Sequence, residues 1–241
     1  MTSRLTETWV YLSSSPLLWL TLTVGAFVAA DWLYRRSGRH PLLNPLGTSV
    51  ALLATVLAVS GTPYARYFEG AQFVHFLLGP AIVALAVPLH RELHRERGVA
   101  VPLTAALLAG AVTSVVTAVG AARLLGASRE TLLSLAPKSV TAPVAMGIAE
   151  KLGGLPSLTA ALVILTGLFG SVVGTALLGR LGVREGPAAG FALGVASHGL
   201  GTARAFELGP SAGAFAGLGM GLNALATSVV VPLLARLLVG S

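Results

Sequence analysis

The sequence contains no cysteine, so disulfide bonds and metal sites built on thiolates are excluded. Charged residues are also scarce: they make up 10% of the 241 residues, whereas soluble domains carry about a quarter. Hydrophobic residues make up 54%. Because so few charges cannot cover a surface that faces water, we expect the chain to fold within a lipid bilayer.

The apolar residues form runs of about 17 to 25 residues, the length that a helix needs to cross ~30 Å of hydrocarbon. We therefore predict an all-α polytopic membrane protein with about seven or eight apolar segments, forming a single transmembrane domain over residues 1–241. The segments that can be marked are 16–34, 45–60, 73–89, 100–122, 131–149, 157–179, 187–206 and 211–238.

The formal charge of +7 comes from arginines dispersed among short loops, so a nucleic-acid-binding face is not expected. The loops 35–44 and 90–98 carry three arginines each and are predicted to face the cytoplasm. The loop 61–72 has one arginine and one glutamate and is predicted to lie outside. Segment 16–34 is followed by arginines, which is the reverse of a cleavable signal peptide, so it should remain as a helix.

Segment 131–149 is the most informative, because Pro137 and Pro143 bracket polar residues inside an apolar run. Proline removes a backbone donor and clashes with the preceding turn, so the two prolines predict a broken helix that either spans the bilayer or re-enters it. Lys138 lies between them, and an ammonium at membrane depth is costly without a counterion or an aqueous cavity. We interpret Lys138 as an anion-binding residue. The alternative is that it reaches the lipid headgroups from near the start of the segment.

Segment 187–206 is rich in glycine, which weakens a helix and predicts a second interruption. The unwound stretch is expected at His198–Thr202, where the free backbone amides near Gly199 and Gly201 could hold a carboxylate. Two interrupted segments are thus expected to meet near the middle of the membrane.

Two side chains of this segment have competing interpretations. The planar fork of donors on Arg204 suits a carboxylate, yet an ion pair with Glu207 one turn on explains this arginine equally well. His198 could couple transport to protons, or it could be a packed, neutral histidine bonded to a carbonyl.

The last segment places Gly213, Gly217 and Gly221 four residues apart, a spacing that favours close helix packing. Asn223 is expected to bond to a neighbouring helix or to a ligand. A faint internal repeat is also visible, in which Pro80 and Pro137 are the helix-breaking residues, although chance similarity explains it as well. The repeat matches Leu78, Pro80, Val83 and Val87 with Leu135, Pro137, Val140 and Val144.

The signs of the charges favour an anionic ligand. Every aspartate and glutamate lies at a segment end or in a loop, whereas the candidate interior charges are Lys138 and Arg204. A cation carrier would need membrane-embedded oxygen ligands, so no metal site is predicted. No Ser/His/Asp set, HExxH motif or paired carboxylates lie at one depth, so we expect neither an enzyme nor a cofactor.

Several stretches resemble the signature sequences of the LrgB/CidB family, which is also described as antiholin-like. The resemblance covers about residues 41–238 and includes NPLGTS, the Tyr64 and Tyr67 pair, LLGPAIVALAVPL, PKSVTAPVAM, SLTAALVILTG, ASHGLGTARA and AFAGLGMGLNALAT. The family contains bacterial inner-membrane proteins encoded beside a smaller LrgA/CidA partner and described as regulators of murein hydrolase export and autolysis. It also contains the plastid glycolate/glycerate translocator, and transport of pyruvate-like acids is ascribed to bacterial members.

The resemblance and the residues together predict a carrier for small organic monocarboxylates that works by alternating access. The alternative is a holin/antiholin-like protein that regulates murein hydrolase export and autolysis. The resemblance implies a bacterial plasma-membrane location and an LrgA/CidA-like membrane partner, and we expect the chain to form homo-oligomers within the lipid bilayer. The predicted substrate-binding residues are Lys138, Ser139, Thr141, His198, Gly199, Gly201, Thr202, Arg204 and Asn223.

Overall fold

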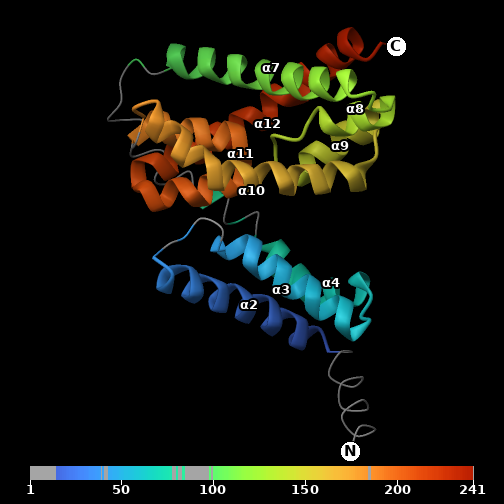
Figure 1. Cartoon of the computed structure of the whole chain (residues 1–241), viewed down its shortest axis with the longest axis vertical. Helices are drawn as coiled ribbons and strands as arrows, with labels where there is room; N and C mark the ends of the chain where they lie inside the picture. The colour runs from blue at the N-terminus through green and yellow to red at the C-terminus, as the bar shows by residue number, and fades with distance from the viewer. Residues whose placement is uncertain are drawn as a thin grey trace, which may run out of the picture. The chain divides into compact units, whose positions relative to one another are not determined.

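The computed structural model describes residues 15–38, 40, 43–77, 80, 83, 84, 98, 100–183 and 186–240. Every regular element among these residues is a helix, as the composition predicted. The chain divides into two compact units, called unit 1 (residues 1–83) and unit 2 (residues 84–241), and both are visible in Figure 1.

Unit 1 contains three described helices, and the first of them packs against the other two. They are α2 (Pro16–Arg36), α3 (Pro45–Ser60) and α4 (Tyr64–Phe76). Proline stands at the start of α2 and α3, where its missing N–H costs nothing. The side chain of Asn44 caps α3 by accepting a hydrogen bond of 3.0 Å from the N–H of Leu46.

The expectation that residues 61–72 form a loop is wrong, because α4 occupies most of this stretch. Aromatic packing stabilises this helix: the rings of Tyr67 and Trp19 meet edge to face with centroids 5.9 Å apart. Gly70 lies directly against the backbone of α2, where a Cβ would collide with the carbonyl oxygen of Pro16. The isolated Arg and Glu made this stretch look like a loop, although Tyr67 and Gly70 pack against α2.

Unit 2 is built around three long helices, which Figure 1 shows running along its length. Its helices are α7 (Ala100–Leu124), α8 (Arg129–Leu135), α9 (Ala142–Leu152), α10 (Pro156–Arg180), α11 (Gly186–Leu208) and α12 (Pro210–Leu238). Together with α2, the helices α7, α10 and α12 are long and apolar enough to cross a membrane, and α3 is a shorter apolar helix. These helices indicate a multi-pass membrane protein.

Helices α8 and α9 fold back on each other. Helix α7 runs toward one end of unit 2 and α10 starts from that same end, so the segment between them begins and ends there (Figure 1). Gly154, just after α9, lies against the backbone of Ser134 near the end of α8. Residues 129–152 therefore form a helical hairpin, here named the first hairpin, with its tip at 136–141.

Helix α11 also reverses direction. Ser197 and His198 have non-helical backbone angles, with φ of −134° and 42° respectively. Residues eight apart in a straight helix lie about 12 Å apart along its axis, yet a Cβ on Gly201 would collide with the carbonyl oxygen of Leu193. The two halves of residues 186–208 therefore run antiparallel and form what we name the second hairpin.

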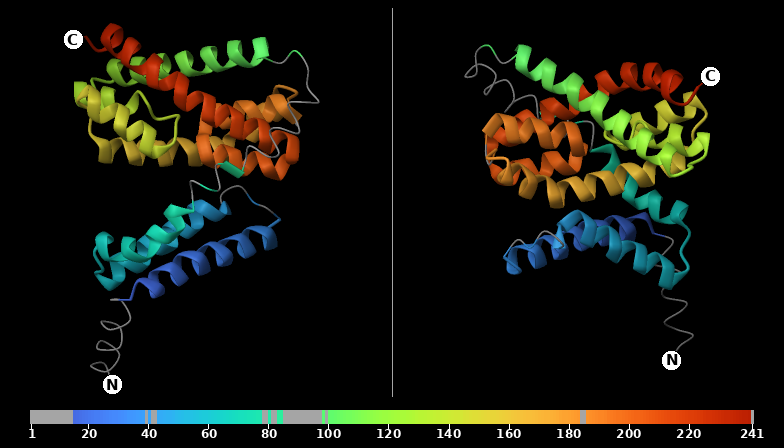
Figure 2. Two further views of the ribbon diagram at one scale, coloured as in Figure 1. Left: turned by 180° about the vertical axis from the view of Figure 1, so that it is seen from behind. Right: turned by 45° about the horizontal axis from the view of Figure 1, so that its top comes forward.

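The second hairpin docks tightly on α12. Gly190 lies against Ala212 and Gly194 against Ala216, in each case so closely that a Cβ would strike a backbone carbonyl. Such close backbone approach lets helices associate without large side chains between them. The second hairpin and the start of α12 lie at one end of unit 2, and the first hairpin lies at the other (Figure 1 and Figure 2).

The unwound stretch is narrower than predicted. The sequence placed it at His198–Thr202, but the backbone departs from a helix only at Ser197 and His198, and Thr202 is helical. The reason is that Gly201 stays helical and allows close packing against the backbone of Leu193, rather than interrupting the helix.

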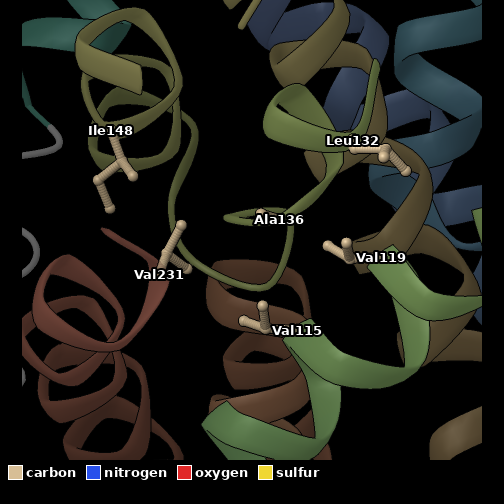
Figure 3. Packing of buried hydrophobic residues seen from close by; sticks show 6 residues of the cluster. All are labelled: Val115, Val119, Leu132, Ala136, Ile148 and Val231. Carbon is tan, nitrogen blue, oxygen red and sulfur yellow. The ribbon is translucent and has the colours of Figure 1, made fainter. Parts of the chain in front are cut away.

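The largest apolar core of unit 2 joins the first hairpin to two long helices. Figure 3 shows these side chains pointing toward one another. The buried members are Val115 and Val119 of α7, Leu132, Ala136 and Ile148 of the first hairpin, and Val231 of α12. This packing fixes the position of the first hairpin and its tip.

Some expectations fall where the structure gives no description. Segment 73–89 and loop 90–98 lie largely outside the described residues, as do Leu78 and Val87 of the predicted repeat. Pro80 is described, but its neighbours Gly79 and Ala81 are not. The predicted break at Pro80 and the internal repeat therefore stay predictions.

Candidate functional site

The tips of the two hairpins meet in the middle of unit 2, where Asn223 of α12 bonds to both. Its side-chain N–H groups donate to the carbonyl oxygen of Ser139 at 3.3 Å and to that of Val195 at 2.9 Å. Its own oxygen accepts a 3.2 Å bond from the hydroxyl of Thr227. Asn223 is buried and every polar atom of its amide is engaged, so it joins the two hairpins.

Lys138 lies at the first tip beside two hydroxyl groups. Its Nζ donates to the Oγ atoms of Ser114 and Ser139, each at 3.2 Å, and these two hydroxyls are 2.6 Å apart. An ammonium carries three donors, so one of them is left for another acceptor. Among the described residues no carboxylate forms an ion pair with Lys138. The group is a partly buried cation for which the described residues supply no counterion.

A cavity of about 570 Å³ leads to Lys138. Its walls come from α7, the first tip and the first half of α11. The lining residues are Pro102, Leu103, Ala106, Gly110, Thr113, Ser114, Lys138, Ser139, Ala188, Phe191, Ala192, Val195 and Ala196. The polar side chains gather at the inner end, and the rest of the wall is apolar.

Two helix N-termini begin at the tips. Helix α9 starts at Ala142, directly after the first tip, and the second half of α11 starts after His198. The N-terminus of a helix carries roughly half a positive charge, so both add to the positive potential of this region. Thr141 precedes α9 without capping it through its side chain, and Pro143 stands in the first turn, where proline is tolerated.

The acidic side chains of unit 2 that are described lie away from the tips. Glu130 is in the first turn of α8, Glu150 is near the end of α9 and Glu207 is near the end of α11. The end of the cavity beside Lys138 therefore has positive character that none of these three acidic side chains neutralises.

His198 anchors the second tip to α10. Its Nε2 donates a 3.0 Å hydrogen bond to the carbonyl oxygen of Val163, and its ring lies against Gly167, where a Cβ would leave it no room. The φ of 42° is a strained value for a residue with a side chain. Thr202 donates to the carbonyl oxygen of His198 at 2.9 Å. Both side chains are buried and neither lines the cavity.

The structure does not bring Arg204 to the cavity. Its guanidinium pairs with Glu207 one turn on, which is the simpler of the two interpretations that the sequence allowed. Arg204 is absent from the cavity lining and lies six residues beyond His198, roughly 9 Å along a helix. Lys138 and Arg204 therefore do not form a joint clamp in this conformation.

The predicted glycines have different surroundings. Gly199 is exposed with open space beside it, and Gly201 is packed against Leu193. In α12, Gly213 packs against the ring of Phe206, Gly217 is partly buried, and Gly221 is exposed with nothing near it. Close packing within unit 2 thus involves Gly213, whereas Gly221 faces outward.

Sequence reasoning missed Ser114, which faces Lys138 from α7. The signal was available, because Thr113 and Ser114 form a polar pair in the middle of an apolar segment. It also missed Ser197, whose hydroxyl is buried against Gly170 with no hydrogen-bond partner among the described residues. A single serine next to a histidine in a sequence does not indicate that its hydroxyl will be buried without a hydrogen bond.

Comparisons with known proteins agree on one family. The sequence profile of the LrgB-like family matches residues 23–237. The chain is 37% identical to the uncharacterised protein YxaC of Bacillus subtilis, over 89% of this chain and 93% of that protein. It is 35% identical to the holin-like protein CidB of Staphylococcus epidermidis, over 81% and 85%, and 33% identical to CidB of Staphylococcus aureus, over 90% and 95%. No solved structure matches.

Proposed function

Because this chain belongs to the LrgB-like family, we propose that it is a multi-pass protein of the bacterial inner membrane that carries small organic monocarboxylates by alternating access. The observation that carries the proposal is Lys138, a partly buried ammonium in the wall of a cavity, with no carboxylate paired to it in the described part of the chain. A charge at membrane depth is costly unless it meets a partner or water. A carboxylate entering the cavity supplies that partner.

The surroundings of Lys138 suit a carboxylate in particular. The ammonium contributes a charge-assisted hydrogen bond, and the hydroxyls of Ser114 and Ser139 hold it in place and are close enough to contribute donors of their own. The N-terminus of α9 adds positive potential beside it. Helix ends and broken helices at the membrane midplane are a common way for secondary carriers to hold anionic substrates.

The hairpins also suit a moving carrier. Asn223 bonds to both tips and His198 bonds the second tip to α10, so these elements would move together as one body. We propose that alternating access comes from movement of this body against the earlier helices of the chain. In this proposal Lys138 and Ser139 contact the substrate, whereas Asn223, His198 and Thr202 hold the tips in position.

A second candidate function is favoured by the names of two relatives, both of which are holin-like proteins. In this alternative the chain oligomerises through an outward face such as that of Gly221 and controls a lesion through which murein hydrolases act. It would allow leakage with little regard to the size or charge of the solute. An LrgA/CidA-like partner fits either function.

Reconstituted liposomes distinguish the two functions. We expect saturable uptake of labelled pyruvate, glycolate and glycerate by the purified chain, and loss of uptake in Lys138→Ala. The control is Lys151→Ala, which removes the only other lysine, an exposed one near the end of α9. Unsaturable leakage of both pyruvate and sucrose, unchanged in Lys138→Ala, would establish the holin-like function instead.

A further inference from the structure

The cavity is much larger than a three-carbon acid. Its volume is about 570 Å³, whereas the six non-hydrogen atoms of pyruvate occupy on the order of 180 Å³ if each takes the ~30 Å³ of a water molecule. Cavities of several hundred Å³ hold ligands with a sizeable body. A small acid bound to Lys138 would leave most of this space to water against apolar walls.

The polar groups of the cavity gather at one end. Thr113, Ser114, Lys138 and Ser139 lie at the inner end, while the outer part is lined by aliphatic, proline and phenylalanine side chains. Ala106 and Gly110 of α7 and Phe191 and Ala192 of α11 line this outer part. Among the described residues, no acidic or second basic side chain lines it. The recognition chemistry is therefore one cation joined to an extended apolar surface.

We propose that the ligand of this cavity is a monocarboxylate with a branched aliphatic or aromatic body, held with its carboxylate at Lys138 and its body between α7 and α11. This rests on the proposed function and names the substrate class of the same site. A second carboxylate on the ligand would meet an apolar wall in which the described residues supply no cation, and such an unpaired charge is strongly unfavourable. Additional hydroxyls would likewise lose their hydrogen bonds to water, which disfavours polyhydroxy acids.

A series of 2-oxo acids shows how the body of the ligand affects binding, because its members share the same 2-oxo carboxylate group and differ only in the rest of the molecule. The probes are pyruvate, 4-methyl-2-oxopentanoate, phenylpyruvate and 2-oxoglutarate, measured by calorimetric binding to the purified full chain and by uptake into liposomes. Each methylene that fits an apolar pocket is worth about tenfold or more in discrimination. We expect the branched and aromatic acids to bind at least about tenfold more tightly than pyruvate, and 2-oxoglutarate to bind more weakly than pyruvate.

Two neighbouring alanines of α7 provide a matched pair of variants. Both are exposed, but Ala106 lines the cavity and Ala105 does not. Ala106→Leu fills part of the outer cavity, so it should weaken binding of 4-methyl-2-oxopentanoate by about tenfold and that of pyruvate by less. Ala105→Leu adds the same side chain outside the cavity and should leave the ratio of the two affinities unchanged.

The outcomes separate this inference from the proposed function. Lys138-dependent binding of pyruvate with equal or weaker binding of the branched acid would overturn the apolar-body proposal and leave the carrier standing. A preference for the branched acid that Ala106→Leu and Ala105→Leu change equally would also overturn it, because the body would then bind elsewhere. Absence of binding for every acid overturns both.

Discussion

The two hairpins of unit 2 fold back by different means. The first turns through the six residues 136–141 and carries a lysine that faces a cavity. The second turns through Ser197 and His198 alone, with one strained φ, and its tip is buried against α10. The comparison teaches that an open, polar tip is available for a ligand, whereas a tight, buried tip serves as an anchor.

The variant with the largest expected effect disrupts the packing of the second hairpin. Gly194→Ala places a methyl group against the backbone carbonyl of Ala216, which cannot move without shifting α12. We expect a loss of about 3 kcal/mol in the free energy of unfolding, or a fall of about 6–12 °C in the unfolding temperature in detergent.

The matched change in the first hairpin has the opposite expected sign. Gly147 of α9 has open space where a Cβ would lie. Gly147→Ala should therefore raise stability by about 0.5–1 kcal/mol, because alanine loses less backbone freedom than glycine in a helix. If both variants lose stability equally, the hairpins do not differ in packing as described.

The variant with the next largest expected effect removes the hydrogen bonds that join the two hairpins. Asn223→Ala removes the donors to the carbonyl oxygens of Ser139 and Val195 and leaves both buried without them. We expect the free energy of unfolding, measured by thermal unfolding, to fall by about 2 kcal/mol. Thr227→Val is the control, because it removes only the bond to the oxygen of Asn223 and should cost about 1 kcal/mol. Equal losses would show that Asn223 does not join the tips.

A smaller effect tests the strain at the second tip. His198→Ala and His198→Gly both remove the bond to Val163, but glycine adopts a positive φ freely. The glycine variant should be more stable than the alanine variant by about 1 kcal/mol, measured as the difference between their unfolding temperatures. An alanine variant as stable as the glycine variant would show that the backbone at this tip is unstrained.

Much of this architecture could be predicted from sequence, and the failures have physical causes. Apolar length predicted the long helices, and the prolines on either side of Lys138 predicted the interruption there. The helix α4 was missed because its stability comes from aromatic contacts with α2 rather than from its own apolar length. Ser114 stands out in the sequence as part of a polar pair with Thr113, but its contact with Lys138 could not be predicted, because only the fold brings α7 beside that lysine, 24 residues away.

Arg204 gives the smallest expected effect and tests the site most directly. The sequence made Arg204 a partner of Lys138, whereas the structure pairs it with Glu207 on the returning half of the second hairpin. Arg204→Gln removes a partly exposed ion pair, and such pairs contribute about 0–1 kcal/mol. We expect the affinity for pyruvate in calorimetric binding to change by less than about twofold, against the complete loss expected for Lys138→Ala. A loss as large as that of Lys138→Ala would mean that the second hairpin reaches the substrate in another conformation, and the division between an open tip and an anchoring tip would then fail.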